Sequence, residues 1–248
     1  GIISVVIYRG EVDMKKMVVC TFENTLIDDE ESISMKTMLE IDRLRNNGYL
    51  FTTVSENDLD YVLSYNRDFP FLDFIVFFDG AGIFDTKLNK VILKKQINYT
   101  ATKKIINICL DYDIYVYTAF QKIKINSIDD IVNYKKDILR IDIFGKNITT
   151  LYKKLIALDL DINITKTDHI KILSNCSRCF SVDTICMKKK IDISNCFVIG
   201  GCILDIETIN KYRGNSINNA PLKLRRISNR VSVNNNSLRV CELLRELS

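Results

Sequence analysis

The first eighty residues alternate between short apolar runs and segments with helical spacing of apolar positions. Apolar runs over 17–22, 49–54 and 74–78 are typical of buried strands. Between them, apolar residues recur every three or four positions over 34–47 and 59–65, which predicts helices. Strands that alternate with helices favour a parallel sheet with helices packed on its faces. This part of the chain therefore predicts an α/β fold.

The middle of the chain has a different rhythm, and the first one returns near residue 172. The pattern predicts a hairpin over 83–94, helices over 102–110, 128–134 and 148–158, and strands over 115–119, 139–144, 162–165 and 169–174. It then predicts helices over 183–190, 203–211 and 237–247, with strands over 196–199 and 230–233. We therefore expect a doubly wound parallel core formed by residues 1–82 and 172–248. Residues 83–171 are expected to form an inserted α+β domain.

Composition limits the class of protein without indicating a reaction. The chain has 248 residues, of which 47% are hydrophobic and 27% charged, as in folded globular proteins. No apolar run reaches the roughly 18 residues of a membrane span, and the charges near the N-terminus follow the apolar stretch rather than precede it. We therefore expect an intracellular, cytoplasmic protein with its eight cysteines reduced. Many Ile, Asn and Lys residues without any Trp suggest an AT-rich source, such as a large DNA virus, and in that case a virion-associated protein.

A polar segment follows the first predicted strand and carries the first candidate chemistry. It begins Thr21-Phe22-Glu23-Asn24-Thr25-Leu26. This order resembles the first motif of the haloacid dehalogenase (HAD) superfamily, in which a strand ends in D-x-D-G-T-L. The resemblance puts Thr21 at the place of the nucleophilic aspartate, which also binds Mg²⁺, and Glu23 at that of the acid/base aspartate. The Thr hydroxyl carries no charge, and the sequence shows no base beside it.

Two further segments follow the next strands. Ser55 follows the second strand and precedes Glu56 and Asn57, and this segment resembles a phosphate-binding motif in which an Arg occupies the place of Asn57. Ser55 keeps the hydroxyl, whereas Glu56 adds a charge of the wrong sign for binding phosphate. Asp79 follows the third strand, and Asp79-Gly80-Ala81 resembles the stretch that leads into the cap domain of Cof-type phosphatases.

The last two motifs are eroded. By spacing, the family's Lys should fall near Phe180 or Ser181, and the nearest lysines form the run 188–190. The stretch from Gly200 resembles G-D-x-x-N-D, with Gly201 at the place of the first Asp and Asp205 at that of the last. A cation such as Mg²⁺ needs several oxygen ligands, and the resemblance leaves only Asp205, with Glu23 at best. We therefore expect no catalytic residue, no metal and no cofactor, with Mg²⁺ bound only if residual activity remains.

Three hypotheses for function follow from the resemblance. The first is an inactive, Cof-type pseudophosphatase that serves as a binding or scaffold module for a protein partner, in a viral complex for assembly, replication or transcription. The second is a weak metal-dependent phosphatase that uses Glu23, Ser55 and Asp205. The third is contact with nucleic acid through a basic C-terminal cluster. That cluster consists of Lys223, Arg225, Arg226 and Arg230.

Overall fold

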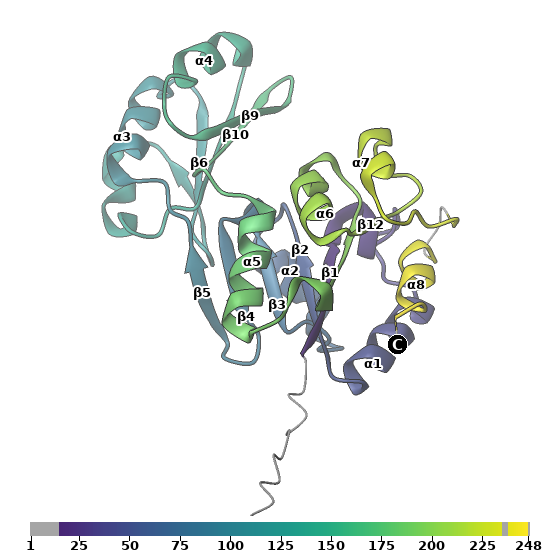
Figure 1. Ribbon diagram of the computed structural model, residues 1–248. Coiled ribbons are helices and arrows are strands. Elements are labelled where there is room, and N and C mark those ends of the chain that lie inside the picture. Colours follow the sequence, from purple (N-terminus) through teal and green to yellow (C-terminus); the bar gives the residue numbers. More distant parts are fainter. Residues whose placement is uncertain (1–14, 235–237, 248) are drawn as a thin grey trace, which may run out of the picture.

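The computed structural model describes residues 15–234 and 238–247. The N-terminal segment, for which we expected no secretory signal, lies outside the described residues. The chain forms two sheets, each with its own helices and its own hydrophobic core (Figure 1). None of the helices within the described ranges is long and apolar enough to cross a membrane.

The larger sheet has seven strands in the order β12-β11-β1-β2-β3-β4-β5. From β12 to β3 neighbouring strands are parallel, and β4 and β5 add to the sheet in antiparallel pairs. The sequences of parallel strands that are covered on both faces are continuous apolar runs, as in β1. The strand bounds are β1 Lys16–Thr21, β2 Tyr49–Val54, β3 Phe74–Phe77, β4 Gly82–Asp85, β5 Lys90–Lys94, β11 Cys196–Gly200 and β12 Asn215–Ser216.

Helices flank this sheet, and three of them, α1, α2 and α5, begin at a residue whose side chain caps the helix. In α1, Ile41 and Leu44 are buried, and Ser34 caps the helix by accepting a hydrogen bond from the N–H of Thr37. The α5 and α6 helices contact each other and lie in front of the sheet in Figure 1, whereas α1 contacts α8. The helix bounds are α1 Met35–Asn46, α2 Leu59–Asn66, α5 Arg178–Lys189, α6 Ile206–Tyr212, α7 Leu222–Ile227 and α8 Arg239–Leu244.

The smaller sheet has five antiparallel strands in the order β7-β6-β8-β10-β9. Its isoleucines pack with α3 (Tyr99–Ile108), α4 (Ile148–Leu155) and the 3₁₀ turn Ile128–Tyr134. Side chains alternate along a strand, so the other face carries the polar residues. The strand bounds are β6 Asp113–Tyr117, β7 Lys122–Ile125, β8 Arg140–Phe144, β9 Asp161–Lys166 and β10 His169–Leu173.

The predicted fold class, an α/β core with an inserted α+β block, is confirmed, although several bounds differ. The hairpin predicted over 83–94 was assigned to the insertion, but its strands pair with β3 in the larger sheet. The chain therefore passes from one sheet to the other between β5 and α3, rather than at residue 83. In place of the strand predicted over 230–233, Val231 makes a single bridge to Ser216. The sequence prediction also missed β7, and it started α5 five residues too late.

Candidate functional site

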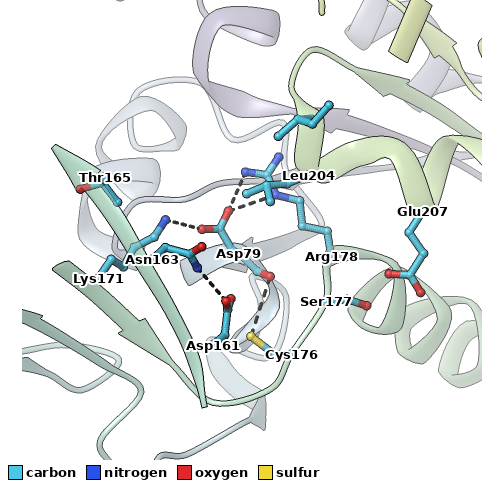
Figure 2. Close-up of a pocket in the computed structure, with 11 residues that line it drawn as sticks. Asp79, Asp161, Asn163, Thr165, Lys171, Cys176, Ser177, Arg178, Leu204 and Glu207 are labelled. Carbon is cyan, nitrogen blue, oxygen red and sulfur yellow. Dashed lines mark hydrogen bonds and ion pairs between the residues drawn. The ribbon is translucent and has the colours of Figure 1, made fainter. Parts of the chain in front are cut away.

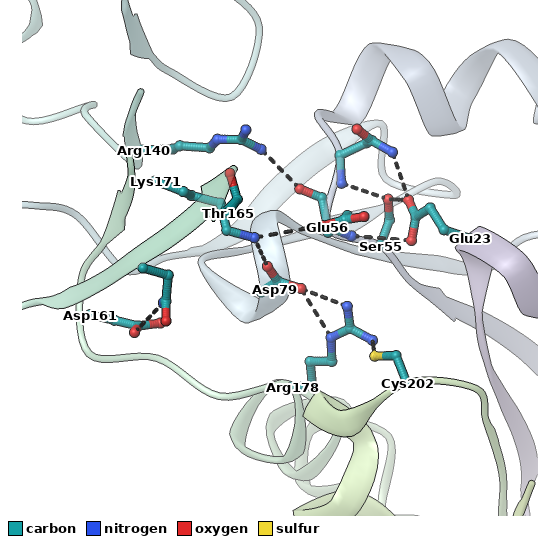
Figure 3. A network of polar contacts seen from close by, with 12 residues as sticks. Glu23, Ser55, Glu56, Asp79, Arg140, Asp161, Thr165, Lys171, Arg178 and Cys202 are labelled. Atoms are coloured by element: carbon teal, nitrogen blue, oxygen red, sulfur yellow. Dashed lines mark hydrogen bonds and ion pairs between the residues drawn. The ribbon is translucent and has the colours of Figure 1, made fainter. Parts of the chain in front are cut away.

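The ends of four strands meet at one edge of the larger sheet, and Figure 3 shows the residues that follow two of them, Ser55 and Asp79. Thr21 ends β1, Ser55 follows β2, Asp79 follows β3 and Gly201 follows β11. These four strands are neighbours and run parallel, so their carboxyl ends lie at the same edge. In open α/β sheets this edge is where ligands bind. The fold thus brings together, at one edge, the residues that the sequence placed at the ends of the strands.

A hydrogen bond joins Thr21 to Asp205 at this edge. The hydroxyl of Thr21 donates to Oδ2 of Asp205 at 2.8 Å, and both side chains are buried. The same oxygen accepts from the backbone N–H groups of Gly201 at 2.8 Å and Cys202 at 2.9 Å, which fixes the carboxylate in the turn Ile203–Asp205. The sequence showed no base beside Thr21, but the fold places one there from a residue 184 positions away.

Glu23 is held by the loop that follows β2. It lies in the loop Phe22–Leu26, and its Oε1 accepts from the hydroxyl of Ser55 and from the side-chain amide of Asn57, the latter at 3.0 Å. The backbone N–H of Glu56 lies 3.3 Å from its other oxygen. The acid/base candidate is therefore fixed in place by hydrogen bonds from neutral donors.

Arg178 is a site residue that the sequence prediction missed. It is 5% exposed, and its guanidinium lies between two carboxylates from separate strand ends. Nη1 is 2.8 Å from Oδ1 of Asp205, whereas Nη2 and Nε are 2.6 and 3.1 Å from Oδ1 of Asp79. Burial lowers the pKa of Arg178, but the charges of Asp205 and Asp79 outweigh it and raise the pKa above its ordinary value. The guanidinium is therefore permanently charged.

Arg178 also corrects the expectation that the third motif has no cation. The Lys was sought near Phe180 or Ser181, and the run 188–190 lies near the other end of the helix. The basic residue is found earlier, as the first residue of α5. Ser177 is the N-cap, since its side chain accepts from the N–H of Phe180 at 3.0 Å. A serine before a helix is a recognised start signal, and it was the one clue in the sequence to this position.

Lys171 reaches the site from the smaller sheet. Its Nζ is 2.7 Å from Oδ2 of Asp79 and 3.6 Å from a carboxylate oxygen of Glu56. From β8, Arg140 donates to the backbone carbonyl of Glu56 at 3.1 Å. Burial raises the pKa of Asp79, but the charges of Arg178 and Lys171 outweigh it and leave the pKa below its ordinary value. These ion pairs join the two sheets across the site.

A cavity of about 380 Å³ opens between the two sheets beside these residues (Figure 2). Its walls come from β9 of the smaller sheet, from the segment leading into α5 and from the start of α6. This volume suits a small molecule. The lining residues are Asp79, Asp161, Asn163, Thr165, Lys171, Cys176, Ser177, Arg178, Ile203, Leu204 and Glu207.

The basic C-terminal cluster lies on and after α7 and does not line this cavity. Lys223, Arg226 and Arg230 are exposed, and Arg225 is partly buried. Arg230 is ion-paired with Glu246. Contact with nucleic acid through this cluster stays a prediction.

The donor set does not fit the Mg²⁺ that the resemblance implies. Both oxygens of Asp205 already accept hydrogen bonds, from Arg178 on one side and from Thr21 and two backbone N–H groups on the other. A Cβ at Gly201 would lie 1.9 Å from Oγ1 of Thr25, so a carboxylate has no room there. Within residues 15–234 and 238–247, no three His, Cys, Asp or Glu side chains are grouped as metal ligands. The side chains at this edge therefore do not form a site for Mg²⁺.

Removing the cap of α5 should loosen the helix that carries Arg178. We expect Ser177→Ala to lower the free energy of unfolding by about 1 kcal/mol, because the N–H of Phe180 loses its acceptor. Urea denaturation measures the change. Ser194→Ala, at an exposed serine, is the control and should change stability by less than about 0.5 kcal/mol. Equal effects of the two substitutions would show that the cap does not hold the helix.

Comparison with known proteins identifies the fold. A family model described as haloacid dehalogenase-like hydrolase matches residues 18–130. A haloacid dehalogenase-like hydrolase from Bacteroides thetaiotaomicron is 14% identical with a TM-score of 0.83, covering 94% of this chain and all of that one. A protein from Thermotoga maritima is 16% identical with a TM-score of 0.84, covering 95% and 98%. The fold is that of the HAD-like hydrolases. A search of the curated proteins found no match.

A third structure with the HAD-like fold bears on activity. It is a sugar phosphatase of HAD subclass IIB, 13% identical with a TM-score of 0.74, and the match covers 93% of this chain and 98% of that one. The interpretation of this chain as an inactive pseudophosphatase scaffold is wrong on these comparisons, because the matching family model and the Bacteroides thetaiotaomicron structure are described as hydrolases and the third structure as a phosphatase. They favour the alternative, a phosphatase. The physical reason is that Arg178 supplies a cation that the motif comparison counted as lost, and that Asp205, which the comparison kept, lies beside Thr21. A protein partner and a viral source stay predictions.

Proposed function

We propose that this chain belongs to the HAD-like hydrolases and is a slow phosphate monoester hydrolase, with the Thr21–Asp205 pair as its reaction centre. The hydrogen bond of 2.8 Å between the Thr21 hydroxyl and Asp205 carries the proposal. A hydroxyl in contact with a carboxylate base is the arrangement that activates an alcohol as a nucleophile. The match of the hydrolase family model, which includes Thr21 and Glu23, supports the same reaction. So does the cavity that is lined by Arg178, the side chain that contacts Asp205.

The reaction proceeds in two steps with the residues present. Oγ1 of Thr21 attacks phosphorus while its proton passes to Asp205, and protonated Glu23 donates a proton to the leaving alcohol. Water then attacks the phosphothreonine, Glu23 takes the proton of that water, and Asp205 returns a proton to Oγ1. One ester and one water become one alcohol and one phosphate. A phosphothreonine is a stable ester, so the second step is the slower one and the intermediate accumulates.

Two substitutions at the pair test this proposal. Thr21→Ala should abolish phosphate release, because it removes the attacking oxygen, and Asp205→Asn should lower the rate about a hundredfold, because it removes the base. The measurement is phosphate release from p-nitrophenyl phosphate and a panel of sugar phosphates. Mass spectrometry of the quenched reaction should find phosphate on Thr21.

The matched controls are Thr149→Ala, at an exposed threonine of α4, and Asp192→Asn, at an exposed aspartate. Both should keep the wild-type rate. A wild-type rate no higher than that of Thr21→Ala on every substrate would refute the proposed function.

A further inference from the structure

We propose that the guanidinium of Arg178 takes the place of the divalent cation in this site, so that the site excludes Mg²⁺. The inference concerns the binding of cations and starts from the disagreement between the donor set and the metal implied by the resemblance. It rests on the proposed function only where it concerns the reaction. Figure 3 shows Arg178 between Asp79 and Cys202, at the edge where the strands end.

The first argument is electrostatic. Asp79 and Asp205 come from the ends of different strands and are 7% and 3% exposed, and each contacts the same guanidinium. Two buried carboxylates that face one space need a positive charge between them, because otherwise one of them takes up a proton. Arg178 supplies this charge in a form that cannot be deprotonated in a protein. Lys171, with its Nζ 2.7 Å from Oδ2 of Asp79, supplies the second positive charge, so no charge of the pair is left for a metal to neutralise.

The second argument is about ligands. Magnesium binds near-octahedrally to oxygen atoms that have free lone pairs. Oδ2 of Asp205 accepts from three donors, among them the hydroxyl of Thr21, and Oδ1 accepts from Arg178. The space beside Gly201, where a second carboxylate would stand, holds the side chain of Thr25. A cation could enter only by displacing the guanidinium.

The third argument is about position. The N-cap Ser177 fixes the start of α5, and the aliphatic stem of Arg178 is buried with its head. The Sγ of Cys202, 3.1 Å from Nη1, adds a further contact on the side of Asp205. Because Arg178 also lines the cavity, a phosphate ester that enters the cavity meets a fixed cation rather than a metal that must first be bound. The proposed hydrolysis should therefore be unaffected by EDTA.

Titration with Mn²⁺, followed by electron paramagnetic resonance and calorimetry, tests the inference without any measurement of turnover. Wild type should bind no Mn²⁺ at this site, and its melting temperature should not change with Mg²⁺. Arg178→Met keeps much of the aliphatic volume but removes the charge, so it should gain one Mn²⁺ site and a melting temperature that rises with Mg²⁺. Arg178→Lys keeps a positive charge and should bind at least tenfold more weakly than Arg178→Met. Lys188→Met, at an exposed lysine of the same helix, is the control and should behave as wild type.

A Mn²⁺ site that is present in wild type and lost in Asp205→Asn would overturn the inference. A folded Arg178→Met variant without Mn²⁺ binding would do so as well. If Arg178→Met does not fold, the titrations of wild type and Arg178→Lys decide. Absence of phosphatase activity in wild type would refute the proposed function but would not change what the Mn²⁺ titrations show about cation binding. Phosphatase activity that EDTA abolishes would refute only the exclusion of the metal.

Discussion

Gly80→Ala is expected to lower the free energy of unfolding by about 3 kcal/mol. Gly80 has φ = +106°, a conformation that costs a residue with a Cβ about 1–2 kcal/mol. A Cβ at this position would also lie 2.5 Å from the carbonyl oxygen of Ser177 and 2.7 Å from its carbonyl carbon. Those atoms belong to the backbone at the start of α5 and cannot rotate away. The clash should therefore add to the cost of the conformation.

A second glycine separates the two contributions. Gly48 also has a positive φ, +83°, but nothing lies within 4 Å of its ideal Cβ. Gly48→Ala should therefore cost only about 1 kcal/mol. Urea denaturation of both variants measures the difference, and the spectrum of the folded protein shows whether each variant is native. Losses of equal size would mean that Gly80 matters for its backbone conformation alone and not for its approach to α5.

The ends of the strands could be predicted from the sequence. Most of the site residues that the larger sheet carries could be predicted with them. Thr21, Ser55 and Asp79 follow apolar runs that form neighbouring parallel strands, and alternation of strands and helices places such residues at one edge. Asp205 could be placed in the same way, after the strand that ends at Gly200. Local pattern suffices for these positions because each residue lies within a few positions of the element that carries it.

The remaining half of the site depends on contacts between distant segments. Lys171 points to the site because of the register in which β10 pairs with β8. The local sequence pattern does not predict that register. Arg178 was missed because the predicted helix began at 183, and helix boundaries are the least certain part of a prediction from one sequence. The inactive interpretation followed from the same limit. A residue-by-residue comparison counted the loss of each carboxylate but could not see that Asp205 lies beside Thr21.

Asp79→Asn is expected to lower the free energy of unfolding by about 3–5 kcal/mol at neutral pH. The substitution removes the charge that Arg178 and Lys171 share, and these two cations are only 5% and 7% exposed. Two buried cations without their common counterion repel each other and lose their charge-assisted hydrogen bonds to residue 79. Urea denaturation measures the loss. Asp111→Asn, at an exposed aspartate, is the control and should change stability by less than about 0.5 kcal/mol.

The carboxylate of Asp79 should also make part of the free energy of unfolding depend on pH. The pKa of Asp79 is lower in the folded protein than the value of about 3.9 in an unfolded chain, so the folded state binds fewer protons. Its contribution is therefore complete above about pH 5 and is lost as the pH falls through the folded value. The asparagine variant has no such group, so the gap in unfolding free energy between wild type and Asp79→Asn should narrow between about pH 5 and about pH 3. Urea denaturation at both pH values measures the gap, and a gap that stays constant or widens on acidification would show that the charge on Asp79 does not stabilise the fold.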